Sequence, residues 1–240
     1  MKIFKLVLIS FFLISTANSN SIYNLIKIPN LEIYKLKTPN KLKYFYAEKP
    51  FRLGVQKNIA CSNSDKKTYD KKFKIIFKSL NRYSAEFLKK INLKYIVMCE
   101  NLSISGINTA GIPDHVMKTL IIDLKFNEKY FERVIHHELF HIISDGFKDL
   151  FNEEKWKKFN DPNFKYANCS TCSKNLGLDT YKNTNGFFTE YSMTIPSEDM
   201  AEVYSHLISG NYKTSDDKIL NKKIKFIKDK LNEIDSTFVF

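Results

Sequence analysis

The segment at residues 137–141, with the letters HELFH, constrains this 240-residue chain more than any other feature. An α-helix has about 3.6 residues per turn, so His137 and His141 lie on one face and both imidazoles can reach a single metal ion. Apolar residues continue with helical spacing on both sides, at Tyr130, Phe131, Val134, Ile135, Leu139, Ile142 and Ile143. The pattern predicts a buried helix that carries two metal ligands and ends near residues 145–146.

The residue types in this segment are those of a zinc hydrolase site. Neutral imidazole is a good ligand for Zn²⁺, and the carboxylate of Glu138, beside the first histidine, can take a proton from a bound water. The alternative is a helix with two incidental histidines. A catalytic zinc also needs a third protein ligand, so another part of the chain must supply one.

A second candidate helix at residues 197–202 contains two carboxylates one turn apart. Pro196 precedes it, and Ser197 is a suitable N-cap. Glu198 can be the third metal ligand. Glu202 can accept the outer N–H of a ligand histidine, which would fix the tautomer of that imidazole and raise its basicity.

These two segments, HELFH at residues 137–141 and EDMAE at residues 198–202, together resemble the gluzincin family of zinc metallopeptidases. In that family the third zinc ligand is a glutamate on a second helix. Tyr191 stands seven residues before Glu198, an arrangement similar to that in the catalytic domain of anthrax lethal factor and related zinc-binding metallopeptidases. The resemblance covers roughly residues 67–208 and is carried by the motif segments.

The resemblance implies one Zn²⁺ per chain, with His137, His141 and Glu198 as its ligands. Glu138 would be the general base of peptide hydrolysis. The hydroxyl of Tyr191 would stabilise the oxyanion of the tetrahedral intermediate.

Other polar residues near the motifs are weaker candidates. Asp145, four residues after His141, could bond to a site residue as part of the second shell with Glu202, although helix termination also explains it. His136 projects about 100° away from His137 and is expected at the surface or behind a ligand. His206, one turn after Glu202, is expected in a partly exposed polar position.

The N-terminus has the pattern of a secretory signal peptide at residues 1–19. Residues 1–5 are basic, residues 6–14 are apolar, and residues 17–19 have the small residues of a cleavage site. The apolar run is shorter than the roughly 20 residues that span a bilayer. We therefore expect an exported protein, secreted or periplasmic, with no transmembrane span in the mature chain.

Export changes the interpretation of the four cysteines, because disulfides form in oxidising compartments. Among the three ways to pair them, the sequence favours Cys61 with Cys99 and Cys169 with Cys172. Two alternatives remain for Cys169 and Cys172: they could form half of a metal-binding knuckle, or they could be a redox-active pair.

The order of elements indicates the fold class. Residues 73–88 have the apolar spacing of one amphipathic helix, and residues 95–98 form a short buried strand. After a break that contains Gly111, residues 119–124 form a second strand, which could be the sheet edge where an extended peptide binds. With the metal helix this order predicts an α+β, zincin-like domain with a small mixed sheet and two metal-ligand helices.

The remaining segments complete the expected domain organisation. Residues 20–65 contain prolines, lysines and short apolar runs, and are expected to be a poorly defined N-terminal extension. Residues 66–240 would form the catalytic domain. Its last part, near residues 220–234, has the spacing of an amphipathic helix that packs on the core; a coiled coil would need more heptads. Trp156 is expected either in the core or beside a substrate pocket.

The formal net charge of +12 favours anionic partners, such as an envelope surface, in addition to a peptide or protein substrate. The lysines are spread along the chain without a nucleic-acid-binding motif, so no nucleic-acid partner is expected. Three hypotheses follow from the sequence: a secreted zinc endopeptidase, a zinc protein without catalysis, and a basic envelope-binding module. The first is the prediction that we carry forward.

Overall fold

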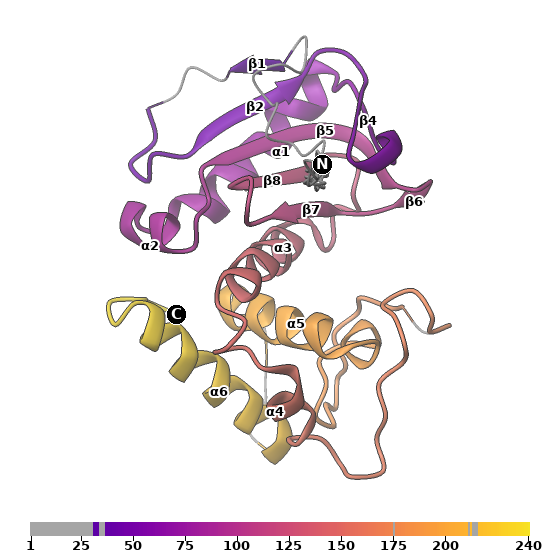
Figure 1. Cartoon of the computed structure of the whole chain (residues 1–240), viewed down its shortest axis with the longest axis vertical. Helices are drawn as coiled ribbons and strands as arrows, with labels where there is room; N and C mark the ends of the chain where they lie inside the picture. Colours follow the sequence, from indigo (N-terminus) through magenta and orange to yellow (C-terminus); the bar gives the residue numbers. More distant parts are fainter. Residues whose placement is uncertain (1–30, 34–36, 175, 211, 213–215) are drawn as a thin grey trace, which may run out of the picture.

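The computed structural model describes residues 31–33, 37–174, 176–210, 212 and 216–240. The predicted signal peptide lies outside the described residues. The chain forms an α+β domain with one mixed sheet above a group of helices, as the sequence predicted (Figure 1). In the part of the chain that is described, no helix combines the length and the apolar character needed to cross a membrane.

Within the described residues the sheet has eight strands. In chain order they are β1 (Leu31–Ile33), β2 (Lys43–Ala47), β3 (Phe51–Leu53), β4 (Ile59–Ser62), β5 (Tyr95–Ile104), β6 (Ile107–Asn108), β7 (Gly111–Asp114) and β8 (Thr119–Asp123). Strands on both sides of the predicted domain boundary at residue 65 therefore hydrogen-bond within one sheet.

The ten-residue strand β5 organises the sheet because its two halves have different neighbours. The first half pairs in parallel with β2 and β8, and the second half pairs antiparallel with β4 and β6. β7 pairs antiparallel with the outer side of β8. The prediction that residues 119–124 form the sheet edge is wrong, because β7 covers that side of β8.

The two faces of the sheet belong to two apolar clusters, because successive side chains of a strand point to opposite faces. Ile96 and Met98 of β5 face the helices and join the larger cluster. Val97 and Cys99 face the other way and join a smaller cluster with residues of β3 and β4. β5 is therefore buried on both faces.

The helices are α1 (Lys66–Asn81), α2 (Ala85–Lys90), α3 (Phe131–Gly146), α4 (Glu153–Lys157), α5 (Pro196–Ser209) and α6 (Lys218–Ile234), with short 3-10 turns at Val55–Lys57 and Tyr191–Met193. The predicted single helix at residues 73–88 is in fact α1 and α2. The chain breaks there because Ser84 is extended and its hydroxyl accepts the N–H of Phe87 at 3.0 Å, which starts a new helix.

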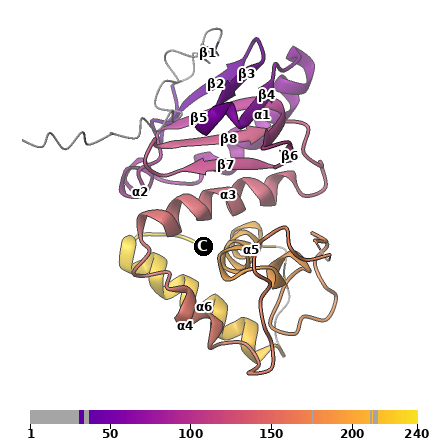
Figure 2. The same ribbon diagram turned by 45° about the vertical axis from the view of Figure 1, so that its right-hand side comes forward.

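The helix α3 lies between the sheet and the group formed by α4, α5 and α6 (Figure 1). It runs beneath β7 on one side and contacts α5 on the other, with α6 beside α5 (Figure 2). Leu220, Ile227 and Leu231 of α6 are fully buried in the larger cluster. The prediction that the last helix packs on the core is confirmed.

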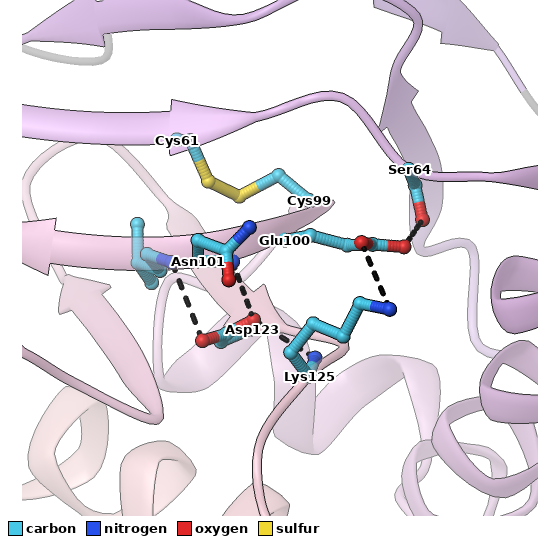
Figure 3. The surroundings of a disulfide bond; sticks show 8 residues. Cys61, Ser64, Cys99, Glu100, Asn101, Asp123 and Lys125 are labelled. Atoms are coloured by element: carbon cyan, nitrogen blue, oxygen red, sulfur yellow. Dashed lines mark hydrogen bonds and ion pairs between the residues drawn. A yellow bond between two sulfur atoms is a disulfide. The ribbon is translucent and has the colours of Figure 1, made fainter.

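Both predicted disulfides are present, Cys61 with Cys99 and Cys169 with Cys172. The first joins β4 to the middle of β5 within the smaller cluster (Figure 3). Beside it, the carboxylate of Asp123 accepts the N–H groups of Asn101 at 3.0 Å and Leu102 at 3.3 Å. These bonds tie the end of β8 to the second half of β5.

Candidate metal centre

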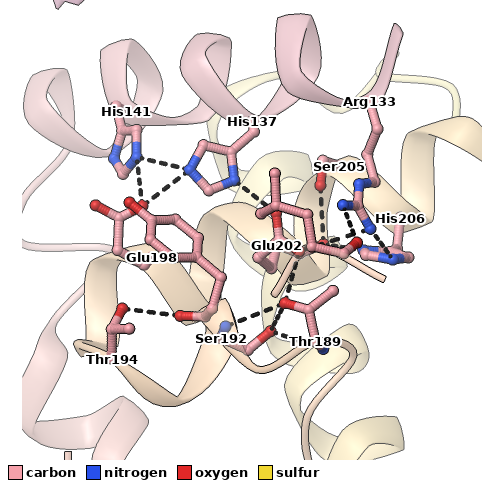
Figure 4. A network of polar contacts seen from close by, with 12 residues as sticks. Arg133, His137, His141, Thr189, Ser192, Thr194, Glu198, Glu202, Ser205 and His206 are labelled. Carbon is pink, nitrogen blue, oxygen red and sulfur yellow. Dashed lines mark hydrogen bonds and ion pairs between the residues drawn. The ribbon is translucent and has the colours of Figure 1, made fainter. Parts of the chain in front are cut away.

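Three side chains from two helices converge between α3 and α5 (Figure 4). The Nε2 atoms of His137 and His141, one turn apart on α3, lie 3.2 Å from each other. Oε2 of Glu198, in the first turn of α5, lies 2.9 Å from Nε2 of His137 and 3.3 Å from Nε2 of His141. The structure thus brings together the three ligands that the sequence proposed.

The donor atoms fit a tetrahedral zinc ion. Zinc–nitrogen and zinc–oxygen bonds of about 2.0–2.1 Å place neighbouring ligand atoms about 3.3 Å apart, close to the observed separations. Nδ1 of His137 lies 2.9 Å from Oε1 of Glu202 and must carry the proton of that hydrogen bond. Nε2 of His137 then faces the carboxylate of Glu198 at 2.9 Å, a contact that is satisfied by a proton on Nε2 or by a metal ion bound to both atoms.

The two carboxylates make this part of the interior favourable for positive charge. Burial opposes protonation of His137, but hydrogen bonds to Glu198 and Glu202 outweigh it and raise its pKa to about 10. Burial likewise opposes ionisation of Glu198, while the positive charge of His141 and the hydrogen bond with His137 lower the pKa of Glu198 well below its usual range. A divalent cation bound here would replace the proton.

Glu138 lies on α3 beside the three converging atoms and lines the same cleft. Burial, the largest cause, raises the pKa of its carboxyl group, although the charges of His137 and His141 oppose that shift. A carboxylate whose pKa is raised toward neutrality is a better proton acceptor at neutral pH than an ordinary glutamate.

Gly111, the first residue of β7, creates the space for Glu138. A Cβ atom at this position would lie 2.6 Å from Cγ of Glu138 and 3.1 Å from the carbonyl oxygen of Ile121. In the sequence, Gly111 indicated only an interruption of regular secondary structure between two predicted strands. No local signal could reveal its contact with Glu138, because the two residues belong to different elements.

We expect Gly111→Ala to lower kcat/KM for the peptide hydrolysis that the sequence predicts by roughly 10²-fold, because moving a catalytic group by about 1 Å has a cost of this size. The new methyl group would displace the side chain of Glu138 and leave the metal ligands in place, so zinc content should stay unchanged. Steady-state kinetics and elemental analysis measure the two quantities. Ile112→Val on the same strand is the control, and equal kinetics for both variants would contradict the prediction.

Tyr191 belongs to the 3-10 turn before α5, and its ring centroid lies 5.8 Å from that of His137. Burial and the nearby carboxylates of Glu198 and Glu138 raise the pKa of Tyr191 far above its ordinary value. Its hydroxyl is therefore a hydrogen-bond donor at the cleft surface. A second tyrosine, Tyr204 of α5, is fully buried, and its hydroxyl donates a hydrogen bond to the hydroxyl of Tyr83 at 3.0 Å.

An open cleft of about 870 Å³ lies in front of these residues. One wall of the cleft contains Asp145, whose side chain is half exposed. Asp145 forms a surface ion pair with Lys148 at 3.7 Å, in place of the bond to a site residue that the sequence suggested. Ser170 and Thr171, between the paired cysteines of the second disulfide, form part of another wall.

The remaining histidines near the site are buried. His136 faces away from the cleft, and its Nδ1 lies 2.7 Å from the hydroxyl of Tyr83; burial lowers its pKa to about 3. The expected partly exposed position of His206 is wrong, because only 1% of this residue is exposed. Its ring stacks on Phe188 with 4.2 Å between centroids.

The start of α5 is held differently from the prediction. Ile195 is the N-cap and Ser197 lies inside the helix, so the expected cap at Ser197 is wrong. Instead, the fully buried Asp199 forms an ion pair with Lys223 of α6 at 2.6 Å and accepts Nε1–H of Trp156 at 2.8 Å. This network, which sequence reasoning missed, joins α4 and α6 to the helix turn that carries Glu198.

A zincin-like fold with two histidines and a glutamate in a cleft is typical of the zinc metallopeptidases. Residues 81–236 match the family described as "putative zinc-binding metallo-peptidase", and the chain belongs to that family. The crystal structure of a putative zinc-binding metallo-peptidase from Bacteroides caccae ATCC 43185 is similar, with 19% identity, 72% of each chain covered and a TM-score of 0.42. No curated protein matches the chain.

Proposed function

We propose that this zinc metallopeptidase is an exported endopeptidase of the gluzincin type, with one Zn²⁺ per chain bound by His137, His141 and Glu198. The observation that carries the proposal is the convergence of three ligand atoms, 2.9 to 3.3 Å apart, where His141, Glu198 and Glu138 line an open cleft. Its motif layout resembles the catalytic domain of anthrax lethal factor.

Each residue of the site has a chemical role in this proposal. Zinc bound there would supply Lewis acidity and lower the pKa of a water molecule toward about 7. Glu138 takes a proton from the attacking water and later delivers it to the departing amine. The hydroxyl of Tyr191 donates a hydrogen bond to the oxyanion of the tetrahedral intermediate. Glu202 keeps the imidazole of His137 in the orientation that points Nε2 at the metal.

The edge strand β7 supports a peptide as substrate. It lies against α3 and pairs with β8 alone among the described strands, so its outer N–H and C=O groups can bind an extended chain. This gives β7 the role that the sequence assigned to residues 119–124. The cleft is open, which favours cleavage within a chain over removal of a terminal residue.

A side pocket of about 520 Å³ adjoins the cleft at Glu138 and Tyr191. Its apolar lining comes from Ile107, Phe126, Val134, Leu176 and Leu178. Besides Glu138, two carboxylates in its wall are already paired, since Asp123 accepts backbone N–H groups and Glu202 bonds to His137. A charged substrate side chain would find no free partner in those two carboxylates, so we propose an apolar residue next to the scissile bond.

Two disulfides support export, because such bonds persist in oxidising compartments. The formal net charge of +12 supports an anionic envelope surface as an additional partner.

The proposed activity is tested by incubating the zinc-loaded protein with a defined mixture of peptides that have blocked termini, followed by mass spectrometry. Internal cuts that disappear with a chelator and return with Zn²⁺ are expected. A zinc-loaded protein that cuts none of the peptides would leave a zinc protein without catalysis, and cleavage restricted to peptides with free termini would replace endopeptidase by exopeptidase.

We expect Tyr191→Phe to lower kcat by about 10²-fold, the typical cost of losing one oxyanion donor, with KM and zinc content little changed. The ring and its packing on His137 remain, so the loss reports on the hydroxyl. Tyr181→Phe is a suitable control on the same loop region. An unchanged kcat in Tyr191→Phe would assign the oxyanion to another group.

A further inference from the structure

Arg133 lies on α3 one turn before His137, and its side chain points toward α5 rather than into solvent (Figure 4). Only 11% of the side chain is exposed. A buried guanidinium is costly unless its charge and its N–H groups have partners. The partners of Arg133 therefore indicate what it does.

Fixed acceptors hold the guanidinium group. One terminal nitrogen donates to the carbonyl oxygen of Leu178 at 2.6 Å. The other donates to Nε2 of His206 at 2.7 Å and lies 3.4 Å from the hydroxyl oxygen of Thr180. These contacts anchor Arg133 to α5 and to the loop that precedes it.

His206 is suited to this contact as a neutral acceptor. Its Nδ1 lies 2.8 Å from the backbone carbonyl oxygen of Glu202 and donates there, so Nε2 is left with the lone pair that Arg133 uses. The stacked ring of Phe188, inclined by 8°, fixes the plane of the imidazole. The direction of the guanidinium is thus determined by the packing of α5.

The charge of Arg133 faces the carboxylate of Glu202, with 3.7 Å between Nη1 and Oε2. Glu202 is 1% exposed and needs a compensating charge. Its Oε1 accepts Nδ1–H of His137, and its Oε2 accepts the hydroxyl of Thr189, each at 2.9 Å. A chain of contacts therefore runs from Arg133 through Glu202 to the outer nitrogen of His137.

We propose that Arg133 is a positioning residue of the metal site, which acts on His137 through Glu202. This inference rests on the proposed role of His137 as a zinc ligand. Arg133 holds the carboxylate of Glu202 in the position that accepts Nδ1–H of His137, so that Nε2 stays available as a ligand. Loss of the guanidinium should weaken metal binding without any change in a ligand.

The test is the zinc dissociation constant, measured by competition with a chromophoric chelator, for a double-mutant cycle. Arg133→Met removes the charge and keeps an unbranched side chain of similar reach. We expect it to weaken zinc binding by about 10- to 100-fold in the parent, the range for partners of ligand histidines. In a Glu202→Gln background the same substitution should have less than about a 3-fold effect, because the neutral amide has no charge for the guanidinium to pair with.

Two further variants separate positioning from packing. Arg133→Lys keeps a charge without the forked geometry and should bind zinc with intermediate affinity. Arg82→Met removes another arginine that binds the backbone of α5, at the carbonyl oxygen of Ile208 (2.6 Å), and should leave zinc affinity unchanged. Urea unfolding of each metal-free variant shows that the comparison is made between folded proteins.

Two results would overturn the inference and leave the proposed function standing. One is an Arg133→Met protein that binds zinc within about 2-fold of the parent; the other is an equal loss with and without Glu202, which would indicate general packing. A parent protein that binds no zinc would instead refute the proposed metal site, and the inference with it.

Discussion

Replacing Glu138 with glutamine is expected to lower kcat for peptide hydrolysis by about 10²–10⁴-fold, the range for loss of a general acid–base group. The amide has the same shape as the carboxylate but cannot take a proton from water. The three ligand atoms that converge beside it are untouched, so one zinc per chain should remain. Kinetics with a quenched fluorescent peptide and elemental analysis measure both quantities.

Glu132→Gln is the matched control, since Glu132 is an exposed glutamate on the same helix. It should keep the activity and zinc content of the parent. If Glu138→Gln retained comparable turnover, another group would have to act as the base.

His141→Ala is expected to abolish zinc binding and, with it, activity. Two remaining protein ligands are too few for a stable catalytic site, which requires three. The small side chain also leaves Oε2 of Glu198 without a neighbour that now lies 3.3 Å away. Elemental analysis of the purified protein should give close to one zinc per chain in the parent and close to none in the variant.

His115→Ala is the control for the loss of an imidazole. His115 lies before β8, its Nδ1 is 3.2 Å from the carbonyl oxygen of Ile91, and its ring lies beside Gly146 at the end of α3 rather than among the three ligand atoms. Its zinc content should equal that of the parent. A His141→Ala protein that still holds one zinc would show that the ligand set is wrong.

The parts of the fold that depend on local spacing were predictable from the sequence. Apolar residues at helical intervals around His137 predicted the position of α3. Glu198 was predicted as the third metal ligand because it follows Pro196 at the start of a second helix. His137, His141 and Glu198 lie close together in the structure, as expected. Both disulfides were also predicted, from an even number of cysteines in a chain with the sequence pattern of a signal peptide.

The parts that depend on contacts distant in sequence were not predictable. The edge strand β7 is four residues long and contains a glycine and a proline, so its alternation is too short to detect. Residues 20–65 appeared irregular because their strands are short, yet β2 and β4 flank the central strand. The pairing of Asp199 with Lys223 depends on how α5 packs against α6, which no single window of sequence records.

The position of α3 between the sheet and the helical layer gives the metal site a thermodynamic consequence (Figure 1). Both layers pack on the helix that carries two ligands, so the site cannot open widely while the core stays intact. A ligand that binds only the folded chain stabilises it by RT ln(1 + [L]/Kd), about 2.7 kcal/mol at a hundred times Kd. The melting temperature thus becomes a gauge of site occupancy, and metals or inhibitors can be ranked by it before any substrate is known.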